Sequence, residues 1–298
     1  MPYIERPDAS IWYEDCGSQD GACVLLIHGG LLEPMDGERF WIAPGVDDGL
    51  VAAGYRCLIP DRRYCAGRTS ADFTSYSFLN DAKDLVAVLD AEGIDQAHVV
   101  AGSNGCSAAL VMAAQVSTSL ASLTLCWPAT QDNALYEAAS QRSTSALQQL
   151  GISAYLALLR ANGLPRPYEE CPDWPFGAAL LHDKRTTELF MAVGAESAAR
   201  VFETTVRSIL SGEVLRGVWH RDVSRIVNAR IPVFIVPPEP EDAFHDRTTA
   251  EMLVDAIDGA RLLDGAPVTP SPHFPTYRAS FIATLSIAFR SARESTKL

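Results

Sequence analysis

The chain has 298 residues, and 48% of them are hydrophobic, which is enough for a sizeable buried core. Its formal net charge of -13 disfavours nucleic acids and anionic membranes as partners. The N-terminus lacks a secretory signal, no apolar run is long enough to cross a bilayer, and the seven cysteines form no CxxC pair. We therefore expect a cytoplasmic protein with reduced cysteines, and the sequence does not indicate whether it forms a homo-oligomer.

Short strands alternate with helices in the first part of the chain. Alternating residues predict an opening hairpin from Tyr3 to Cys16, and apolar runs predict strands at Cys23 to Ile27, Tyr55 to Pro60, His98 to Ala101 and Leu120 to Trp127. Helical spacing runs from Ser77 to Glu92. This alternation predicts a parallel sheet, whose ligands bind beyond the carboxyl ends of its strands.

The strand pattern disappears between Pro128 and about Asp222. Helical spacing is seen instead, at Ala134 to Leu150, Ile152 to Ala161 and Glu188 to Leu210. Strands and covering helices return with Ile231 to Val236, Thr248 to Ile257, Ala260 to Leu263 and Tyr277 to Ala292. We therefore expect a core made of residues 1–128 and 223–298, with a helical lid of residues 129–222 inserted into it.

A serine lies between small residues where a predicted strand gives way to a helix. The stretch Ala101-Gly102-Ser103-Asn104-Gly105 has the form of a nucleophile elbow, in which a strained turn presents a hydroxyl and the following amide to one pocket. Small neighbours are needed because strand and helix nearly touch at such a turn. We therefore predict that Ser103 is a nucleophile.

Two further groups could activate this hydroxyl. Asp242 follows the strand that ends at Val236, and His273 precedes the last helix, which gives the chain order Ser, Asp, His. We expect the imidazole of His273 to accept the serine proton while the carboxylate of Asp242 orients the ring. Two alternatives stay open. Glu239 or Glu241 could replace Asp242, and His245 could compete for the base role, although its closeness to Asp242 favours a local structural role.

Four segments together resemble the α/β-hydrolase superfamily, and the resemblance covers nearly the whole length. They are the elbow, the run His28-Gly29-Gly30-Leu31 after a strand, the stretch Asp61-Arg62-Arg63-Tyr64-Cys65-Ala66-Gly67-Arg68-Thr69-Ser70, and Asp242-Ala243-Phe244-His245. The stretch from Asp61 to Ser70 departs from the family pattern at Tyr64, where glycine is usual. Just upstream of Asp242, Pro237-Pro238-Glu239-Pro240-Glu241 replaces a more usual turn that contains glycine. The resemblance implies an α/β fold with a mostly parallel central sheet, flanking helices and an inserted helical lid.

A negative oxygen on a tetrahedral intermediate needs fixed hydrogen-bond donors. The backbone amides of Gly30 and Asn104 are the candidates for this oxyanion hole, while His28 is expected to hold its loop by a hydrogen bond rather than to react. Leu31, Trp127 and Tyr136 are candidate substrate-binding residues at the mouth and in the lid. No cluster of side chains has the spacing of a metal site, so we expect neither a metal nor an organic cofactor.

These parts predict a hydrolase that cleaves a small carboxylic ester or lactone through an acyl-enzyme intermediate. Thioesterases, carbon-carbon bond hydrolases and aminopeptidases that take an N-terminal proline use the same triad, although the His-Gly-Gly-Pro-Gly run of the last group is absent here. A lyase or a ligand-binding member of the fold is the alternative from a different class, because fold alone does not determine activity.

Overall fold

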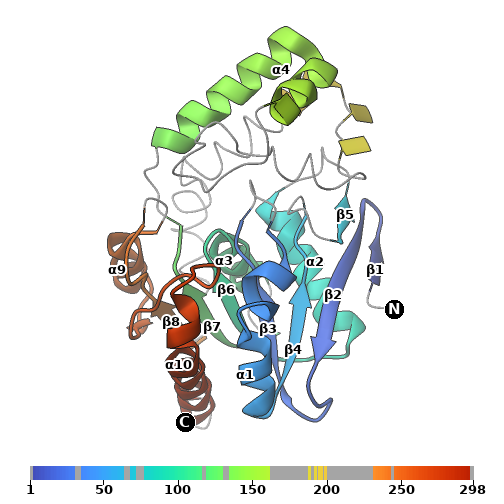
Figure 1. Cartoon of the computed structure of the whole chain (residues 1–298). Helices are drawn as coiled ribbons and strands as arrows, with labels where there is room; N and C mark the ends of the chain where they lie inside the picture. The colour runs from blue at the N-terminus through green and yellow to red at the C-terminus, as the bar shows by residue number, and fades with distance from the viewer. Residues whose placement is uncertain are drawn as a thin grey trace.

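The computed structural model describes residues 3–30, 35–63, 68–71, 77–115, 119–129, 134–161, 187–188, 191–192, 194–196, 198–199, 231–242 and 245–295. Within them lies a nine-stranded sheet with the order β1-β2-β4-β3-β6-β7-β8-β9, and β5 pairs with β2 (Figure 1). The strands are β1 (Tyr3–Arg6), β2 (Ala9–Cys16), β3 (Ala22–Ile27), β4 (Tyr55–Pro60), β5 (Ser70–Ala71), β6 (Ala97–Gly102), β7 (Leu120–Cys126), β8 (Val233–Val236) and β9 (Arg261–Leu262).

The sheet is parallel from β4 to β9, whereas β2 runs antiparallel to its three neighbours β1, β4 and β5. The described helices are the π-helix η1 (Glu38–Ile42), α1 (Val46–Ala52), α2 (Phe78–Ala91), α3 (Gly105–Gln115), α4 (Ala134–Ala161), α9 (Arg247–Ala256) and α10 (Phe274–Ser295). The predicted strands and the predicted helices of the core thus lie where the sequence places them, within a few residues at their ends.

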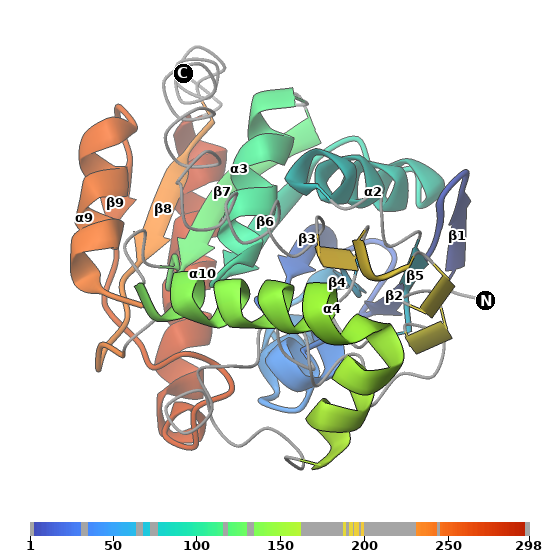
Figure 2. The same cartoon turned by 90° about the horizontal axis from the view of Figure 1, so that it is seen from above.

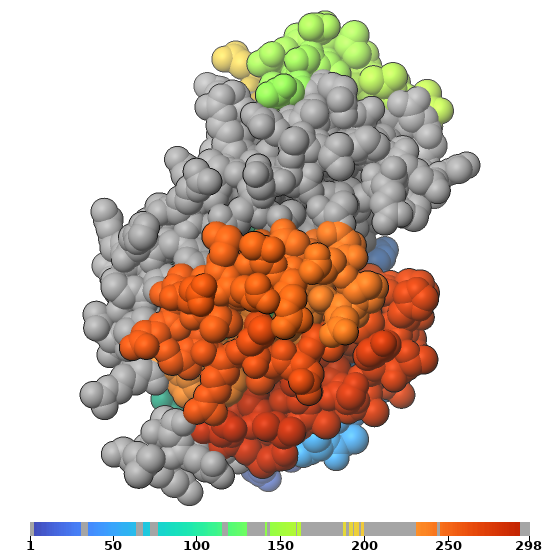
Figure 3. Space-filling view, turned by 90° about the vertical axis from the view of Figure 1, so that its left-hand side faces the viewer, coloured from blue at the N-terminus to red at the C-terminus, as the bar shows by residue number. Residues whose placement is uncertain are grey.

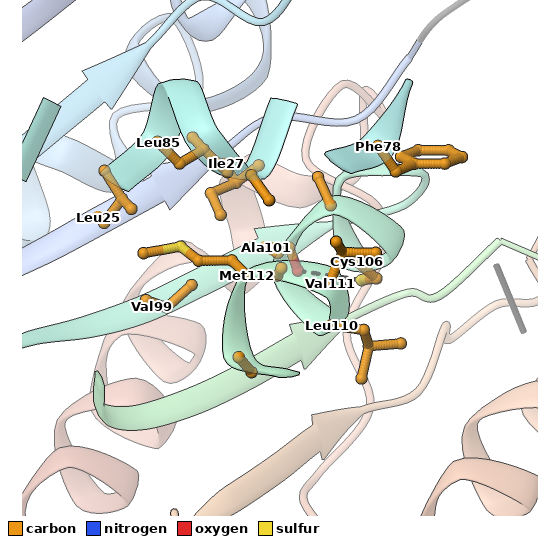
Figure 4. Close-up of a cluster of buried hydrophobic side chains, with 14 of the residues drawn as sticks. Leu25, Ile27, Phe78, Leu85, Val99, Ala101, Cys106, Leu110, Val111 and Met112 are labelled. Carbon is orange, nitrogen blue, oxygen red and sulfur yellow. Dashed lines mark hydrogen bonds between the residues drawn. The ribbon is translucent and has the colours of Figure 1, made fainter. Parts of the chain in front are cut away.

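Each face of the sheet has its own core because alternate residues of a strand point to opposite faces. In β3, Leu25 and Ile27 pack with the apolar faces of α2 and α3, as Figure 4 shows. Val24 and Leu26 pack instead with residues of α1 and α10. Because both faces are covered, the central strands are nearly continuous apolar runs.

The described part of the predicted lid is mainly α4. Seen from above, α4 crosses the edge of the sheet at which the parallel strands end (Figure 2). Its backbone is broken at Gly151, which has φ 74° and ψ 169° and separates the two helices that the sequence predicts there. In Figure 3, α4 lies at the top of one face of the molecule, and α9 and α10 form its lower part. Most of the predicted helix Glu188 to Leu210 lies outside the described residues.

Candidate active site

The turn after β6 has the geometry of a nucleophile elbow. Ser103 is one of two described non-glycine residues with a positive φ, at 51°, and it lies between β6 and α3. A Cβ on Gly102 would lie 2.4 Å from the ring of Phe40, and one on Gly105 would lie 2.5 Å from the carbonyl oxygen of His28. Larger residues would therefore clash on both sides of the serine, which explains the small residues in this stretch.

The imidazole that contacts Ser103 belongs to His245. Its Nε2 lies 2.8 Å from Oγ of Ser103, and its Nδ1 lies 2.9 and 3.0 Å from the two carboxylate oxygens of Asp242. An ionised carboxylate can only accept hydrogen bonds, so Nδ1 carries the hydrogen and Nε2 offers its lone pair to the serine hydroxyl. Hydroxyl, imidazole and carboxylate are therefore joined in one chain of hydrogen bonds.

The turn between Asp242 and His245 fixes this arrangement. Oδ1 of Asp242 also accepts the backbone N–H of His245 at 2.9 Å, and the two backbones form an isolated antiparallel bridge. The side chain of His245 is 11% exposed, whereas that of Asp242 is 40% exposed. The imidazole is thus covered, while its carboxylate partner lies at the surface.

His273 lies elsewhere, in an exposed position directly before α10. Its backbone N–H donates to Oγ of Ser271 at 3.3 Å, and its carbonyl accepts from Oγ1 of Thr276 at 2.8 Å. Within the described residues, the imidazole that hydrogen-bonds to Ser103 is therefore that of His245 and not that of His273, and Asp242 is connected to the serine through this ring. The sequence signal for His245 was its spacing of three residues from Asp242, which lets one carboxylate bind both its backbone and its ring.

The two alternative acids lie beside Asp242 along the chain. Glu239 and Glu241 are both exposed, and the backbone N–H of Glu239 donates to the carbonyl of Ala266. Within the described residues, the carboxylate that hydrogen-bonds to the ring of His245 is that of Asp242. The geometry therefore favours Asp242 over both glutamates.

The predicted oxyanion loop lies against the elbow. A Cβ on Gly29 would be 2.6 Å from Cβ of Ser103, so only glycine allows the loop to approach this closely. Gly30 follows with φ 70°, a conformation that glycine adopts without strain. The amide of Asn104 comes directly after the serine, just before the first residue of α3, where the helix dipole favours negative charge. Both predicted donors thus belong to segments that border Ser103.

His28 has the structural role that the sequence predicts. Its buried ring donates from Nδ1 to the carbonyl of Gly29 at 2.7 Å and accepts at Nε2 from the backbone N–H of Arg62 at 2.8 Å. Burial, together with the positive charge of Arg62, lowers the pKa of His28 to about 4. The ring is therefore neutral near pH 7, and both of its nitrogens are used in holding the loop.

Of the three predicted substrate-binding residues, Trp127 is the one whose side chain the structure describes. Trp127 is fully buried among aromatic rings, which include Phe40 and Phe281, and its indole N–H donates to the carbonyl of Ala266 at 2.7 Å. Its described contacts are thus those of a core residue. Leu31 and the side chain of Tyr136 lie outside what the structure describes, as do residues 64–67.

No group of three or more His, Cys, Asp or Glu side chains in the described ranges could hold a metal ion. Among the same residues, no helix is long and apolar enough to cross a membrane. Cys106, close to the nucleophile in sequence, is buried, and its thiol donates to the carbonyls of Ala101 and Cys126. Burial raises its pKa, which keeps it protonated.

Comparisons with known proteins agree with this architecture. Residues 23–149 match the family model of the alpha/beta hydrolase fold. Rhodomycin D methylesterase DauP of Streptomyces sp. (strain C5) is 33% identical over 124 residues, which are 41% of this chain and 40% of that protein. The chain thus spans about two fifths of the length of the curated relatives it matches.

Solved structures cover much more of the chain. The enol-lactonase from Burkholderia xenovorans LB400 is similar over 97% of this chain and all of its own, with a TM-score of 0.64 and 17% identity. A hydrolase from Pseudomonas aeruginosa PA01 is similar over 96% of this chain and 97% of its own, with the same TM-score and 19% identity. The sheet order, the elbow after β6 and these comparisons lead to one conclusion. The chain has the α/β-hydrolase fold, and its residues 23–149 match the model of that family.

Proposed function

We propose that the protein is a serine hydrolase that cleaves a carboxylic ester or lactone of a small molecule. The observation that carries the proposal is the hydrogen-bond chain from Ser103 through His245 to Asp242. A serine hydroxyl is a weak nucleophile near neutral pH and needs a base within hydrogen-bond reach. In this proposal His245 takes the role that the sequence suggested for His273.

The first half of the proposed reaction forms an acyl-enzyme. Oγ of Ser103 attacks the carbonyl carbon of the substrate while Nε2 of His245 takes the hydroxyl proton, and the carboxylate of Asp242 stabilises the resulting imidazolium. The amides of Gly30 and Asn104 bind the negative oxygen of the tetrahedral intermediate. When this intermediate collapses, His245 gives its proton to the departing alcohol oxygen.

The second half releases the acyl group. A water molecule takes the place of the alcohol, His245 accepts a proton from it, and the hydroxide attacks the carbonyl carbon of the acyl-enzyme. Collapse of the second tetrahedral intermediate returns the proton to Oγ of Ser103 and releases the carboxylic acid. Both halves use the same imidazole and the same oxyanion site, so each must be within reach of the serine.

Esters and lactones are the substrate class that this site supports best. The proposed parts suffice for a bond whose leaving group is an alcohol, since this leaving group needs one proton and no further activation. The similarity to a methylesterase in sequence and to an enol-lactonase in fold supports the same class. α4 passes over the carboxyl edge of the sheet, where a lid would shape the pocket for the acyl or alcohol part (Figure 2).

A covalent probe tests the proposal directly. A fluorophosphonate should modify the protein at Ser103, detected as a mass increase on the peptide that contains this residue, and the modified enzyme should no longer hydrolyse p-nitrophenyl esters. The S103A variant should keep its fold by circular dichroism and lose both labelling and turnover. Turnover retained by S103A would contradict the proposal.

A further inference from the structure

Three consecutive carbonyl groups of the loop after β3 are held by two side chains. Nη1 of Arg62 donates to the carbonyl of His28 at 3.2 Å and to that of Gly30 at 3.1 Å. The carbonyl between them, that of Gly29, accepts from Nδ1 of His28 at 2.7 Å. The backbone N–H of Arg62 in turn binds Nε2 of His28 at 2.8 Å. Arg62 therefore holds the loop both directly and through the ring of His28.

The guanidinium of Arg62 is itself fixed in position. Nε and Nη2 donate to Oδ2 of Asp81 at 3.0 and 2.7 Å, and both side chains of this ion pair are 1% exposed. Asp81 lies in the first turn of α2. A buried ion pair on a helix of the core therefore connects the framework of the fold with the loop beside Ser103.

The hydrogen bonds to the loop carbonyls also set the direction of the backbone N–H of Gly30. In a trans peptide the C=O and the following N–H point in opposite directions, and the one cis peptide among the described residues is Glu239-Pro240. Because the carbonyl of Gly29 points to the ring of His28, the N–H of Gly30 points away from that ring. Gly29 is in turn packed against Cβ of Ser103, so the loop has little freedom to shift relative to the elbow.

We propose that Arg62 is a positioning residue for the oxyanion-binding amide of Gly30, acting through the carbonyls of the loop and through His28. The inference rests on the proposed function, because an oxyanion forms only if Ser103 attacks a carbonyl. A donor contributes most when it is aimed at the oxygen before charge develops there. Weakening the hydrogen bonds of Arg62 to the loop should therefore slow the chemical step more than it weakens substrate binding.

The next residue along the chain provides a matched control. Arg63 is also buried and also pairs with an acid of α2, since its Nη2 donates to Asp84 at 3.0 Å. Nη1 of Arg63 also donates to Asp8 at 2.7 Å. Arg63 thus binds two carboxylates, whereas Arg62 binds a carboxylate and two loop carbonyls. Losing either arginine removes a buried ion pair, and losing Arg62 also removes its hydrogen bonds to the carbonyls of His28 and Gly30.

The test compares an ester with the thionoester of the same acyl and alcohol groups. Sulfur is larger than oxygen and a weaker hydrogen-bond acceptor, so an intact oxyanion hole should favour the ester strongly. We expect R62K to lower kcat for the ester by about 10-fold to 100-fold, up to the effect of losing one oxyanion donor, with KM nearly unchanged. The ratio of ester to thionoester kcat should fall in R62K, whereas R63K should keep the wild-type ratio.

Different outcomes separate the inference from the function on which it rests. If the wild-type enzyme turns over no ester, the proposed function fails. If the wild type is active and R62K lowers ester and thionoester rates equally, or if R63K changes the ratio as much as R62K, the positioning role is overturned. Should R62K not fold, D81N loosens the same guanidinium with an isosteric side chain, and an unchanged ratio in a folded D81N would overturn the inference.

Discussion

Two loops of the molecule each place a histidine just before a helix, but in different surroundings. His245 comes two residues before α9 in the loop after β8, and His273 comes directly before α10 in the loop after β9. The first has an acid three residues earlier that binds both its backbone and its ring. The second has Ser271 two residues earlier, which accepts only its backbone N–H. A local carboxylate therefore decides which imidazole is turned and held toward the serine.

Replacing each of the two histidines by alanine, one at a time, is the most severe test of this comparison. H245A should lower kcat/KM for p-nitrophenyl esters by on the order of 10⁴-fold to 10⁶-fold, because the serine loses its base. H273A should retain nearly wild-type turnover, since His273 is exposed directly before the start of α10. Steady-state kinetics on both variants, with melting temperatures as a check of folding, provide the measurement. Loss of activity in H273A with full activity in H245A would reverse the assignment.

Removing the charge of Asp242 in the first loop should have the next largest effect on turnover. D242N keeps the shape of the side chain but removes the charge that orients and stabilises the imidazolium, so kcat should fall by about 10³-fold to 10⁴-fold. E239Q and E241Q are matched controls, because both remove one exposed negative charge near the same position. Turnover of the three variants should rank D242N far below the other two. A greater loss in either glutamine variant would give that glutamate the acid role.

These contrasts show how far the sequence could predict the site. Apolar runs with small residues at their ends predicted the strands and the elbow, because buried parallel strands and a tight strand-to-helix turn leave few choices of residue. The alternation of strands and helices predicted a parallel sheet with a site beyond the carboxyl ends of its strands. It did not predict the direction of each side chain, and this direction decides between His245 and His273.

The sequence predicted that His28 holds the oxyanion loop, but it did not indicate the partners that do so with it. His28 and Arg62 are 34 positions apart, and Arg62 and Asp81 are 19 apart. Only the packing of β4 and α2 beside β3 brings these groups together, and neither helical nor strand periodicity reports such a contact. The neighbours Arg62 and Arg63 look alike in the sequence, which does not indicate that Arg62 donates to the carbonyls of His28 and Gly30.

A third histidine extends the comparison from activity to stability. His28 is neutral and buried, with a pKa of about 4 in the folded protein against an ordinary value of 6.5. Between these values the unfolded chain binds a proton that the folded protein does not, so this group lowers stability as the pH falls from 6.5 toward 4. The full effect corresponds to about 3 kcal/mol.

Denaturant unfolding of wild type and H28N at pH 7.5 and pH 5 measures this contribution. The wild type should lose more free energy of unfolding on acidification than the variant, because asparagine does not titrate. The buried carboxyl groups whose pKa values are raised by burial, such as Asp84, are shared by both proteins and cancel in the difference. An equal loss in the two proteins would mean that His28 is not the group that resists protonation.

The smallest expected effect on turnover comes from replacing one residue near each histidine, Asp246 in the first loop and Ser271 in the second. Asp246 caps α9, since its side chain accepts the backbone N–H of Thr249 at 2.6 Å, and it directly follows His245. D246A should cost about 1 kcal/mol of stability. It should also lower kcat severalfold, because fraying at the start of α9 loosens the adjoining imidazole. S271A removes the corresponding hydrogen bond beside His273, so it should leave kcat unchanged. Equal changes in kcat for the two variants, measured on the same ester, would show that the end of the first loop does not hold the base.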